Sequence, residues 1–167
     1  MVLVGLPGAG KSTVGRRVAR RIGVDFLDFD REIERRTGTT VAELFAAHGE
    51  QHFRSLELEL TRELAASGGM LLAPGGGWIA NPGAVALLRP PGSIIYLKVR
   101  PEVALRRLGR GQARRPLLQT PDPLGRLRQL LAAREPLFAA ADHIVEVGVL
   151  RPREVIDTVA RLASSIL

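Results

Sequence analysis

Residues 5–12, Gly-Leu-Pro-Gly-Ala-Gly-Lys-Ser, match the pattern G-x-x-x-x-G-K-[ST] at every fixed position. The apolar run Val2–Val4 precedes them, and Ser12–Ile22 follows with apolar side chains at spacings of four. A buried strand, a glycine-rich turn and a helix are therefore predicted in succession. A phosphate-binding loop requires this context.

The residue types of this loop suit a polyphosphate. Gly8 and Gly10 let the backbone turn tightly and present its N–H groups to phosphate oxygens, and the start of the next helix adds its positive dipole end. We expect Lys11 to reach the β- and γ-phosphates and the Ser12 hydroxyl to ligate Mg²⁺. The alternative is a glycine turn that binds nothing, and the complete pattern in its proper context argues against it.

The composition is that of an ordinary globular chain. Of 167 residues, 46% are hydrophobic and 25% charged, which suits one domain with a sizeable core. No cysteine is present, which excludes disulfides and thiolate metal sites. The apolar start at residues 1–5 is too short for a signal peptide or a membrane span. We expect a soluble, cytoplasmic monomer with no membrane partner.

The net charge of +7 comes almost wholly from arginine, since only Lys11 and Lys98 among the 24 basic residues are lysines. No block of five or six like charges occurs, and aromatic content is only 4%, so a nucleic-acid partner is not expected. Two interpretations coexist. Most arginines form a solvated surface, and a few bind phosphate and carboxylate groups.

Short apolar runs alternate with amphipathic stretches along the chain. Alternating strands and helices predict an α/β fold with a parallel sheet covered on both faces, so three layers. Ligands of such sheets bind at the carboxyl ends of the strands. The predicted strands are Val2–Val4, Asp25–Asp28, Met70–Ala73, Ser93–Lys98 and His143–Val147; the predicted helices are Ser12–Ile22, one long helix from the Thr40/Glu43 capping box to about Ala66, Pro101–Leu108, Asp122 to about Ala139, and Pro152–Ile166.

Residues 109–120 have the composition of a mobile loop, with two glycines and the polar side chains Arg110, Gln112, Arg114 and Arg115. The chain has no Asn-Lys-x-Asp guanine signature and is short for a motor or switch protein. A small-molecule kinase with a lid is therefore favoured over a GTPase or an ATPase motor. We expect one kinase domain, residues 1–167, with a lid at about 109–122 and an acceptor-binding helical region at about 30–58.

Asp28 and Asp30 end the second predicted strand. Carboxylates at i and i+2 of a strand point the same way, so both are expected to face one site. Asp28 is the better candidate to hold Mg²⁺, through water, and Asp30 to accept the proton of an acceptor hydroxyl. Capping of the next helix is an equally good explanation of Asp30 from the spacing alone.

Two further clusters follow. Arg54 carries a fork of donors suited to a carboxylate, and Glu57, three residues on, is placed to hold the guanidinium. By spacing alone a surface ion pair is the more common situation. Gly75, Gly76 and Gly77 follow a predicted strand and permit close approach of the backbone to a ligand, although a flexible turn has the same composition.

The full set of motifs resembles the shikimate kinase family. The order is G-x-x-G-x-G-K-S-T, D-x-D, G-E-x-x-F-R-x-x-E, G-G-G and R-P-L-L, spread from Val2 to the last helix. The phosphate loop is shared with many families, whereas the other motifs at these separations are specific. The resemblance implies transfer of the γ-phosphoryl of ATP, with Mg²⁺, to the 3-hydroxyl of shikimate on the path to aromatic amino acids. It also implies a nucleoside-monophosphate-kinase fold with five parallel strands and a lid.

The resemblance further assigns roles by position. Lys11, Asp30 and Arg115 are implied to be catalytic, Asp30 as base and Arg115 as the lid arginine. Ser12 and Asp28 are implied to hold the metal. The implied nucleotide contacts are Gly8, Ala9, Gly10, Lys11, Ser12, Thr13, Arg107, Arg115, Arg151 and Pro152, with Arg107 against one face of the adenine and Arg151 and Pro152 near the other. The implied acceptor contacts are Asp30, Phe45, Phe53, Arg54, Gly75, Gly76, Gly77 and Arg134, with Arg54 and Arg134 at the shikimate carboxylate.

The sequence departs from the family pattern in places. Leu108 stands where threonine is usual, and the segment from Arg107 to the lid arginine is about one residue longer. Arg114 therefore competes with Arg115 for the catalytic role. Phe138 replaces a usual tyrosine, and we expect Trp78, after the glycines, to pack under the loop rather than narrow the pocket.

Other functions stay open at this point. A kinase for gluconate or a nucleoside monophosphate shares the loop and, for gluconate, the carboxylate. A nucleotide-binding relative without catalysis is opposed by the presence of both Asp30 and Arg115.

Overall fold

A computed structural model describes residues 1–109, 111 and 115–166. Five strands form one parallel sheet in the order β2-β3-β1-β4-β5, as predicted. Because β1 is central, the loop that follows it emerges between two neighbours. The strands are β1 Val2–Val4, β2 Asp25–Asp28, β3 Met70–Ala73, β4 Ile94–Lys98 and β5 His143–Glu146.

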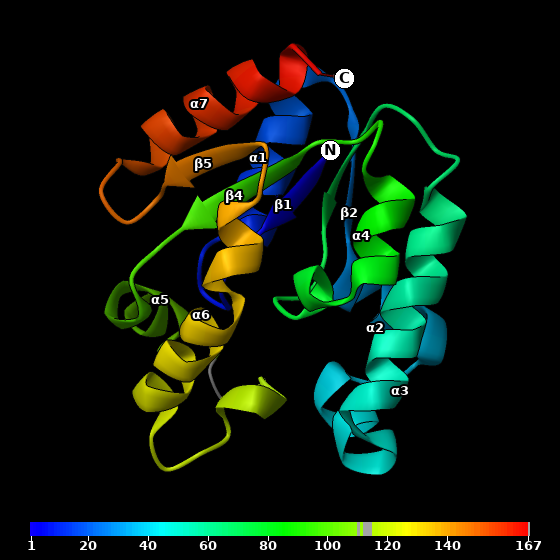
Figure 1. Ribbon diagram of the computed structural model, residues 1–167, viewed down its shortest axis with the longest axis vertical. Helices are drawn as coiled ribbons and strands as arrows, with labels where there is room; N and C mark the ends of the chain where they lie inside the picture. Colours follow the sequence, from blue (N-terminus) through cyan, green and yellow to red (C-terminus); the bar gives the residue numbers. More distant parts are fainter. Residues whose placement is uncertain (110, 112–114, 167) are drawn as a thin grey trace.

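Helices complete a three-layer arrangement. In Figure 1, α4 and α6 lie in front of the sheet and α1 lies behind it, packed against α7. The helices are α1 Lys11–Ile22, α2 Phe29–Thr37, α3 Val41–Leu64, α4 Pro82–Leu88, α5 Pro101–Leu108, α6 Pro123–Ala139 and α7 Pro152–Ser164; short 3₁₀ turns are η1 Trp78–Ala80 and η3 Pro116–Leu118. No helix in the described ranges is both long and apolar enough to span a bilayer.

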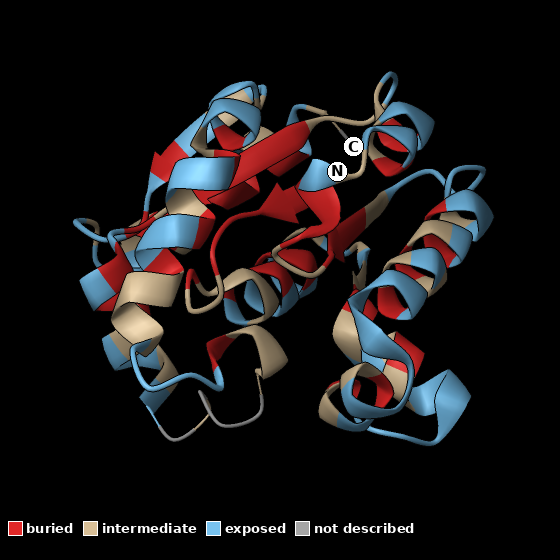
Figure 2. Ribbon diagram, turned by 60° about the horizontal axis from the view of Figure 1, so that its bottom comes forward, coloured by how far each residue is buried: buried red, intermediate tan, exposed pale blue. Residues whose placement is uncertain are grey.

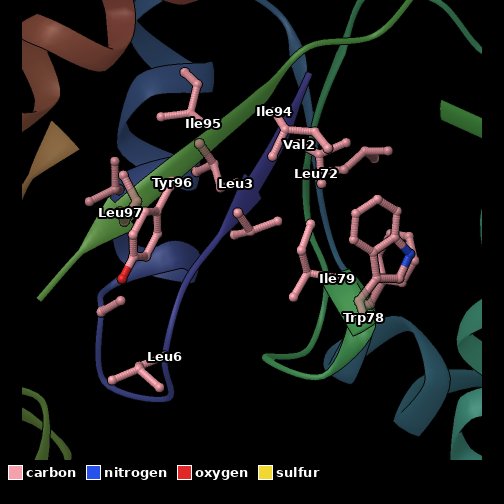
Figure 3. Packing of buried hydrophobic residues seen from close by; sticks show 14 of the residues in the cluster. Val2, Leu3, Leu6, Leu72, Trp78, Ile79, Ile94, Ile95, Tyr96 and Leu97 are labelled. Carbon is pink, nitrogen blue, oxygen red and sulfur yellow. The ribbon is translucent and has the colours of Figure 1, made fainter. Parts of the chain in front are cut away.

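The core lies along the central strands. Every residue of β1 is buried, and so is β4 up to its last residue. Figure 2 shows the same distribution, with buried strands inside and the exposed residues on the outer faces of the helices. Figure 3 shows Val2 and Leu3 of β1 beside Ile94, Ile95 and Leu97 of β4. Continuous apolar strands of this kind require cover on both faces, which explains the parallel sheet.

The region from residue 30 to residue 66 differs from the prediction. The capping box at Thr40 and Glu43 is confirmed, with Thr40 N donating to Glu43 Oε2 at 2.7 Å. The expected single helix to about Ala66 is wrong, because Gly49 has φ 78° and ψ 175° and interrupts it. A positive φ is accessible to glycine at little cost. The chain therefore turns there, between Val41–His48 and the part of α3 that bears Arg54.

Candidate active site

A cavity of about 430 Å³ opens at the carboxyl ends of the strands. The phosphate loop, the end of β2, the glycine segment after β3, α5 and the start of α7 all contribute to it. The predicted residues that line it are Gly8, Ala9, Gly10, Lys11, Ser12, Thr13, Asp28, Asp30, Gly75, Gly76, Arg107, Arg115 and Pro152. Most of the expected nucleotide and catalytic residues thus share one site.

The phosphate loop has the backbone that its glycines predict. Gly8 has φ 85°, and a Cβ there would lie 2.4 Å from the carbonyl oxygen of Ala104. Gly10 has φ 96° and stands at the N-terminus of α1. Both positions therefore exclude a side chain, one by close packing and one by backbone conformation. The loop and the N-terminus of α1 both line the cavity, a position from which the helix dipole favours a bound anion.

The Lys11 ammonium folds back over this loop. Its Nζ donates to the carbonyl oxygens of Gly5 at 3.0 Å and Leu6 at 3.3 Å. Burial lowers the pKa of Lys11 to about 8, Arg115 acts in the same direction, and the carboxylates of Asp30, Asp28 and Glu57 oppose them. Both hydrogen-bond acceptors of Lys11 are neutral carbonyl groups. A bound phosphate would give the ammonium a negatively charged partner and so favour its protonated form.

Asp28 and Asp30 face one cavity, but not for the predicted reason. Asp28 ends β2 and caps α2, its Oδ1 accepting from Arg31 N at 3.3 Å. Asp30 lies in the first turn of α2, so the expected strand alternation does not apply. The capping explanation considered for Asp30 belongs to Asp28. Asp30 instead forms an ion pair with Arg115.

Arg54 and Glu57 form a partly buried ion pair beside the cavity; these two residues, Gly77 and Arg134 are not among the residues that line it. Arg54 Nη1 donates to Glu57 Oε2 at 2.5 Å, and Glu57 is only 2% exposed. The surface-pair interpretation is therefore wrong. Glu50 adds a second, more exposed partner for Arg54 at 2.7 Å. Burial raises the pKa of Glu57, and the Arg54 guanidinium counteracts that shift.

The three glycines lie between the phosphate loop and this ion pair. The Gly75 N–H donates to Glu57 Oε1 at 3.1 Å. A Cβ on Gly76 would lie 3.2 Å from Pro7, and one on Gly77 only 2.2 Å from Arg54 Nη2. Each glycine thus permits a close contact that a side chain would prevent. The segment therefore joins the phosphate loop to the Arg54–Glu57 pair.

Arg134 approaches the same glycines from α6. Its Nη1 donates to the Gly76 carbonyl oxygen at 3.1 Å, and its side chain is buried. Burial lowers its pKa, and the nearby charge of Arg54 adds to the effect. Within the described part of the chain no carboxylate lies within 4.0 Å of it. Two neighbouring guanidiniums, one without a carboxylate partner, form a site for an anion.

The far end of the cavity is apolar and suits a base. Arg107 lies there and donates through Nη2 to the Val147 carbonyl oxygen at 2.6 Å. Arg151 is not among the lining residues; its exposed side chain pairs with Glu154 at 2.6 Å. The apolar lining consists of Leu108, Val147, Leu150, Pro152, Val155 and Ile156.

Two aromatic residues expected at the acceptor stand away from the cavity. Phe53 is 2% exposed, and its ring centroid lies 5.1 Å from that of Phe45. The Arg54 guanidinium lies 5.6 Å from the Phe53 centroid. Phe53 therefore packs between Phe45 and the Arg54 guanidinium.

Two residues of the site were not assigned from the sequence. Arg17, an exposed arginine to which no role was assigned, lines the cavity one turn beyond Thr13, which the helical spacing from the loop could have indicated. Glu57 was assigned only as a partner of Arg54; its bond to Gly75 depends on a contact across 18 residues that no local spacing reveals.

The chain was compared with known proteins. The family model described as shikimate kinase matches residues 7–163. The shikimate kinase of Symbiobacterium thermophilum is 48% identical over 145 residues, covering 86% of this chain and 83% of the relative; that of Caldanaerobacter subterraneus is 41% identical, covering 96% and 94%. The chain belongs to the shikimate kinase family.

A solved structure extends this result to the fold. Shikimate kinase from Acinetobacter baumannii in complex with shikimate superposes with a TM-score of 0.91 at 39% identity, covering 98% of this chain and 92% of that one. The predicted P-loop kinase architecture is thereby confirmed.

The structure accounts for two of the departures from the family pattern, Phe138 and Trp78. Phe138 is fully buried and stacks on Tyr96 with centroids 4.8 Å apart, while the Tyr96 hydroxyl donates to Glu135. Trp78 is 1% exposed and packs beneath the glycine segment, as expected. Of the expected lid, Arg110, Gln112 and Arg114 lie outside the described residues. Arg115 is described and contacts Asp30.

The lowered pKa of Lys11 makes a prediction for this shikimate kinase. At about pH 8.5, above the pKa near 8, most Lys11 side chains in the free protein are neutral, and a bound phosphate raises the pKa again. Binding of ADP should then take up a fraction of a proton. Calorimetry in buffers of different ionisation enthalpy measures this uptake.

Lys11→Arg is the matched control, because it keeps a cation that stays protonated throughout. The uptake should disappear in this variant and should diminish in the wild type near pH 7, where Lys11 is already charged. Equal uptake by both proteins at pH 8.5 would assign the proton to another group.

Proposed function

We propose that this protein transfers the γ-phosphoryl group of ATP to the 3-hydroxyl of shikimate, giving shikimate 3-phosphate and ADP. The observation that supports the acceptor is the pair of guanidiniums at the glycine segment, with buried Arg134 lacking a carboxylate partner among the described residues. A small hydroxylated carboxylate supplies the missing charge. The family and the shikimate-bound relative agree with this choice.

The nucleotide is proposed to lie along the cavity. Its phosphates meet the N–H groups of the phosphate loop and Lys11, and its base reaches the apolar end near Arg107 and Pro152. Arg151 would have to break its ion pair with Glu154 to contact the base, so it is the least supported of the proposed nucleotide contacts.

Two oxygen-bearing side chains in the cavity are of the type that Mg²⁺ prefers as ligands. The Ser12 hydroxyl and the Asp28 carboxylate line the same cavity, and both are hard oxygen ligands. We propose that Ser12 binds the ion directly and Asp28 through water. When bound, Mg²⁺ neutralises charge on the β- and γ-phosphates.

Asp30 is proposed to act as the base. It takes the proton of the 3-hydroxyl as that oxygen bonds to the γ-phosphorus and the bond to the bridging oxygen of ADP breaks. Arg115 pairs with Asp30 and lines the same cavity as Lys11, which supports a position for it beside the transferring phosphoryl group. It can therefore hold the carboxylate and stabilise the charge on the transferring group.

The wider setting is also proposed. The enzyme acts as a cytoplasmic monomer of one domain, with residues 109–122 as lid and 30–58 presenting the acceptor side. The described η3 turn supports the lid assignment, because it contacts both α6 and α3 and so spans the two sides of the site (Figure 1).

The direct test is ADP release from Mg·ATP with shikimate, gluconate or a nucleoside monophosphate as acceptor. We expect stimulation by shikimate alone, because it combines a carboxylate for the two guanidiniums with ring hydroxyls for Asp30. Stimulation by gluconate or a nucleotide alone would keep the P-loop kinase and discard the proposed acceptor.

Asp30→Asn should lower turnover by about 10²–10⁴, the usual contribution of a general base. The amide has the same shape but cannot take the proton. Initial rates at saturating ATP and shikimate measure the loss, and calorimetry should find ADP binding largely retained. Normal turnover in this variant would remove Asp30 from the role of base.

Arg134→Ala should raise the KM for shikimate by about tenfold or more, as expected for a hydrogen bond to a charged group worth about 1.5–3 kcal/mol, with little change in the KM for ATP. Arg128→Ala is the matched control, because Arg128 also lies on α6 but its exposed side chain pairs with Glu102. An effect on ATP alone would place the carboxylate elsewhere. Arg54→Ala is less informative, since it leaves buried Glu57 without its ionic partner.

A further inference from the structure

One buried hydrogen bond lies beneath the acceptor side and has no place in the chemistry. Trp78 Nε1 donates to Thr61 Oγ1 at 3.0 Å, and both residues are fully buried, at 1% and 0% exposed. Thr61 Oγ1 in turn donates to the Glu57 carbonyl oxygen at 2.6 Å. Figure 3 shows the indole nitrogen directed away from Ile79 and Leu72, which leaves only the ring in the aliphatic core.

The partners of the glycine segment lie on one face of α3. Arg54, Glu57 and Thr61 stand at i, i+3 and i+7, a spacing that aligns side chains along a helix. Arg54 lies against Gly77, Glu57 accepts from Gly75 N, and Thr61 accepts from Trp78, the residue after the glycines. Three successive contacts thus join the helix to the segment.

The glycines themselves have no side chains with which to fix their position. Trp78 provides the anchor: its ring is buried, its N–H has one specific acceptor, and η1, which it begins, packs on α4 and α6. A buried N–H that loses its acceptor bears a desolvation penalty. The segment therefore has one well-defined position relative to α3 while this bond is made.

We propose that the Trp78–Thr61 hydrogen bond positions the glycine segment against Arg54 and so sets the affinity for the acceptor, without either residue touching it. This rests on the proposed function, because the acceptor must lie between Arg54, Arg134 and the glycines. If the bond were lost and the segment moved away from α3, Gly77 would no longer pack against the Arg54 guanidinium, and the hydrogen bond from Arg134 to Gly76 would weaken as well. Trp78 and Thr61 are positioning residues.

The test compares Thr61→Val with Trp78→Phe. Valine has the shape of threonine without the hydroxyl, and phenylalanine retains an aromatic ring without the N–H. Each should raise the Kd for shikimate, measured by calorimetry, by about three- to tenfold, with the Kd for ADP and kcat nearly unchanged. Because one bond is removed in both, the double variant should bind no more weakly than the worse single variant by more than about twofold.

Two controls separate positioning from general stability. Thr61→Ser restores the hydroxyl and should recover most of the affinity. Ser165→Ala removes a hydroxyl that bonds to Leu162 O at 2.8 Å at the end of α7, outside the region proposed to present the acceptor, so any loss of stability that it causes should leave shikimate binding unchanged. Trp78→Phe decides the matter alone if Thr61→Val does not fold.

The outcomes are distinct. Unchanged shikimate affinity in both variants, equal losses for shikimate and ADP, or additive losses in the double variant would each overturn the inference while leaving the proposed function intact. Failure of the wild-type protein to bind shikimate would remove the proposed function and this inference with it.

Discussion

The acceptor side of this protein depends on one buried carboxylate. Glu57 is almost completely removed from solvent, and burying a charge is costly unless it is paired and hydrogen-bonded. Its two oxygens meet that requirement from different directions: one accepts from Arg54, the other from the backbone of Gly75. The same contacts that compensate the buried charge bring a helix and a loop together. Arg54, the glycine segment and, through Gly76, Arg134 take their positions from this arrangement.

Two pairs of cationic side chains lie in and beside the cavity. Lys11 and Arg115 line it, with Asp30 paired to Arg115, whereas Arg54 and Arg134 lie outside its lining and contact the glycine segment. Burial lowers the pKa of both Lys11 and Arg134, so each favours an added negative charge beside it. Preorganised charge of this kind suits phosphoryl transfer, in which the protein mainly positions and neutralises. The chain's high arginine content thus includes a small functional subset among many exposed ion pairs.

Sequence was sufficient where the signal is local. The phosphate loop, all five strands and the capping box at Thr40 follow from short patterns, and the structure has each within a residue or so. It was insufficient where tertiary contacts decide. Asp30 was predicted on a strand, whereas the helix that begins at Phe29 already contains it. Helix α4 was not predicted. The break at Gly49 was missed because the surrounding residues have a helical pattern. The burial of Glu57 depends on a segment 18 residues away, which spacing within α3 does not indicate.

Trp78 has a consequence beyond packing, because it is the only tryptophan in the chain. Its indole lies directly after the glycines that line the cavity, one helical turn of α3 from the buried ion pair. Fluorescence excited selectively from tryptophan therefore comes from this one position in the structure, with no contribution from a second tryptophan. The unlabelled protein contains a built-in optical probe, and emission changes on adding a ligand refer to the glycine segment rather than to an average over the molecule.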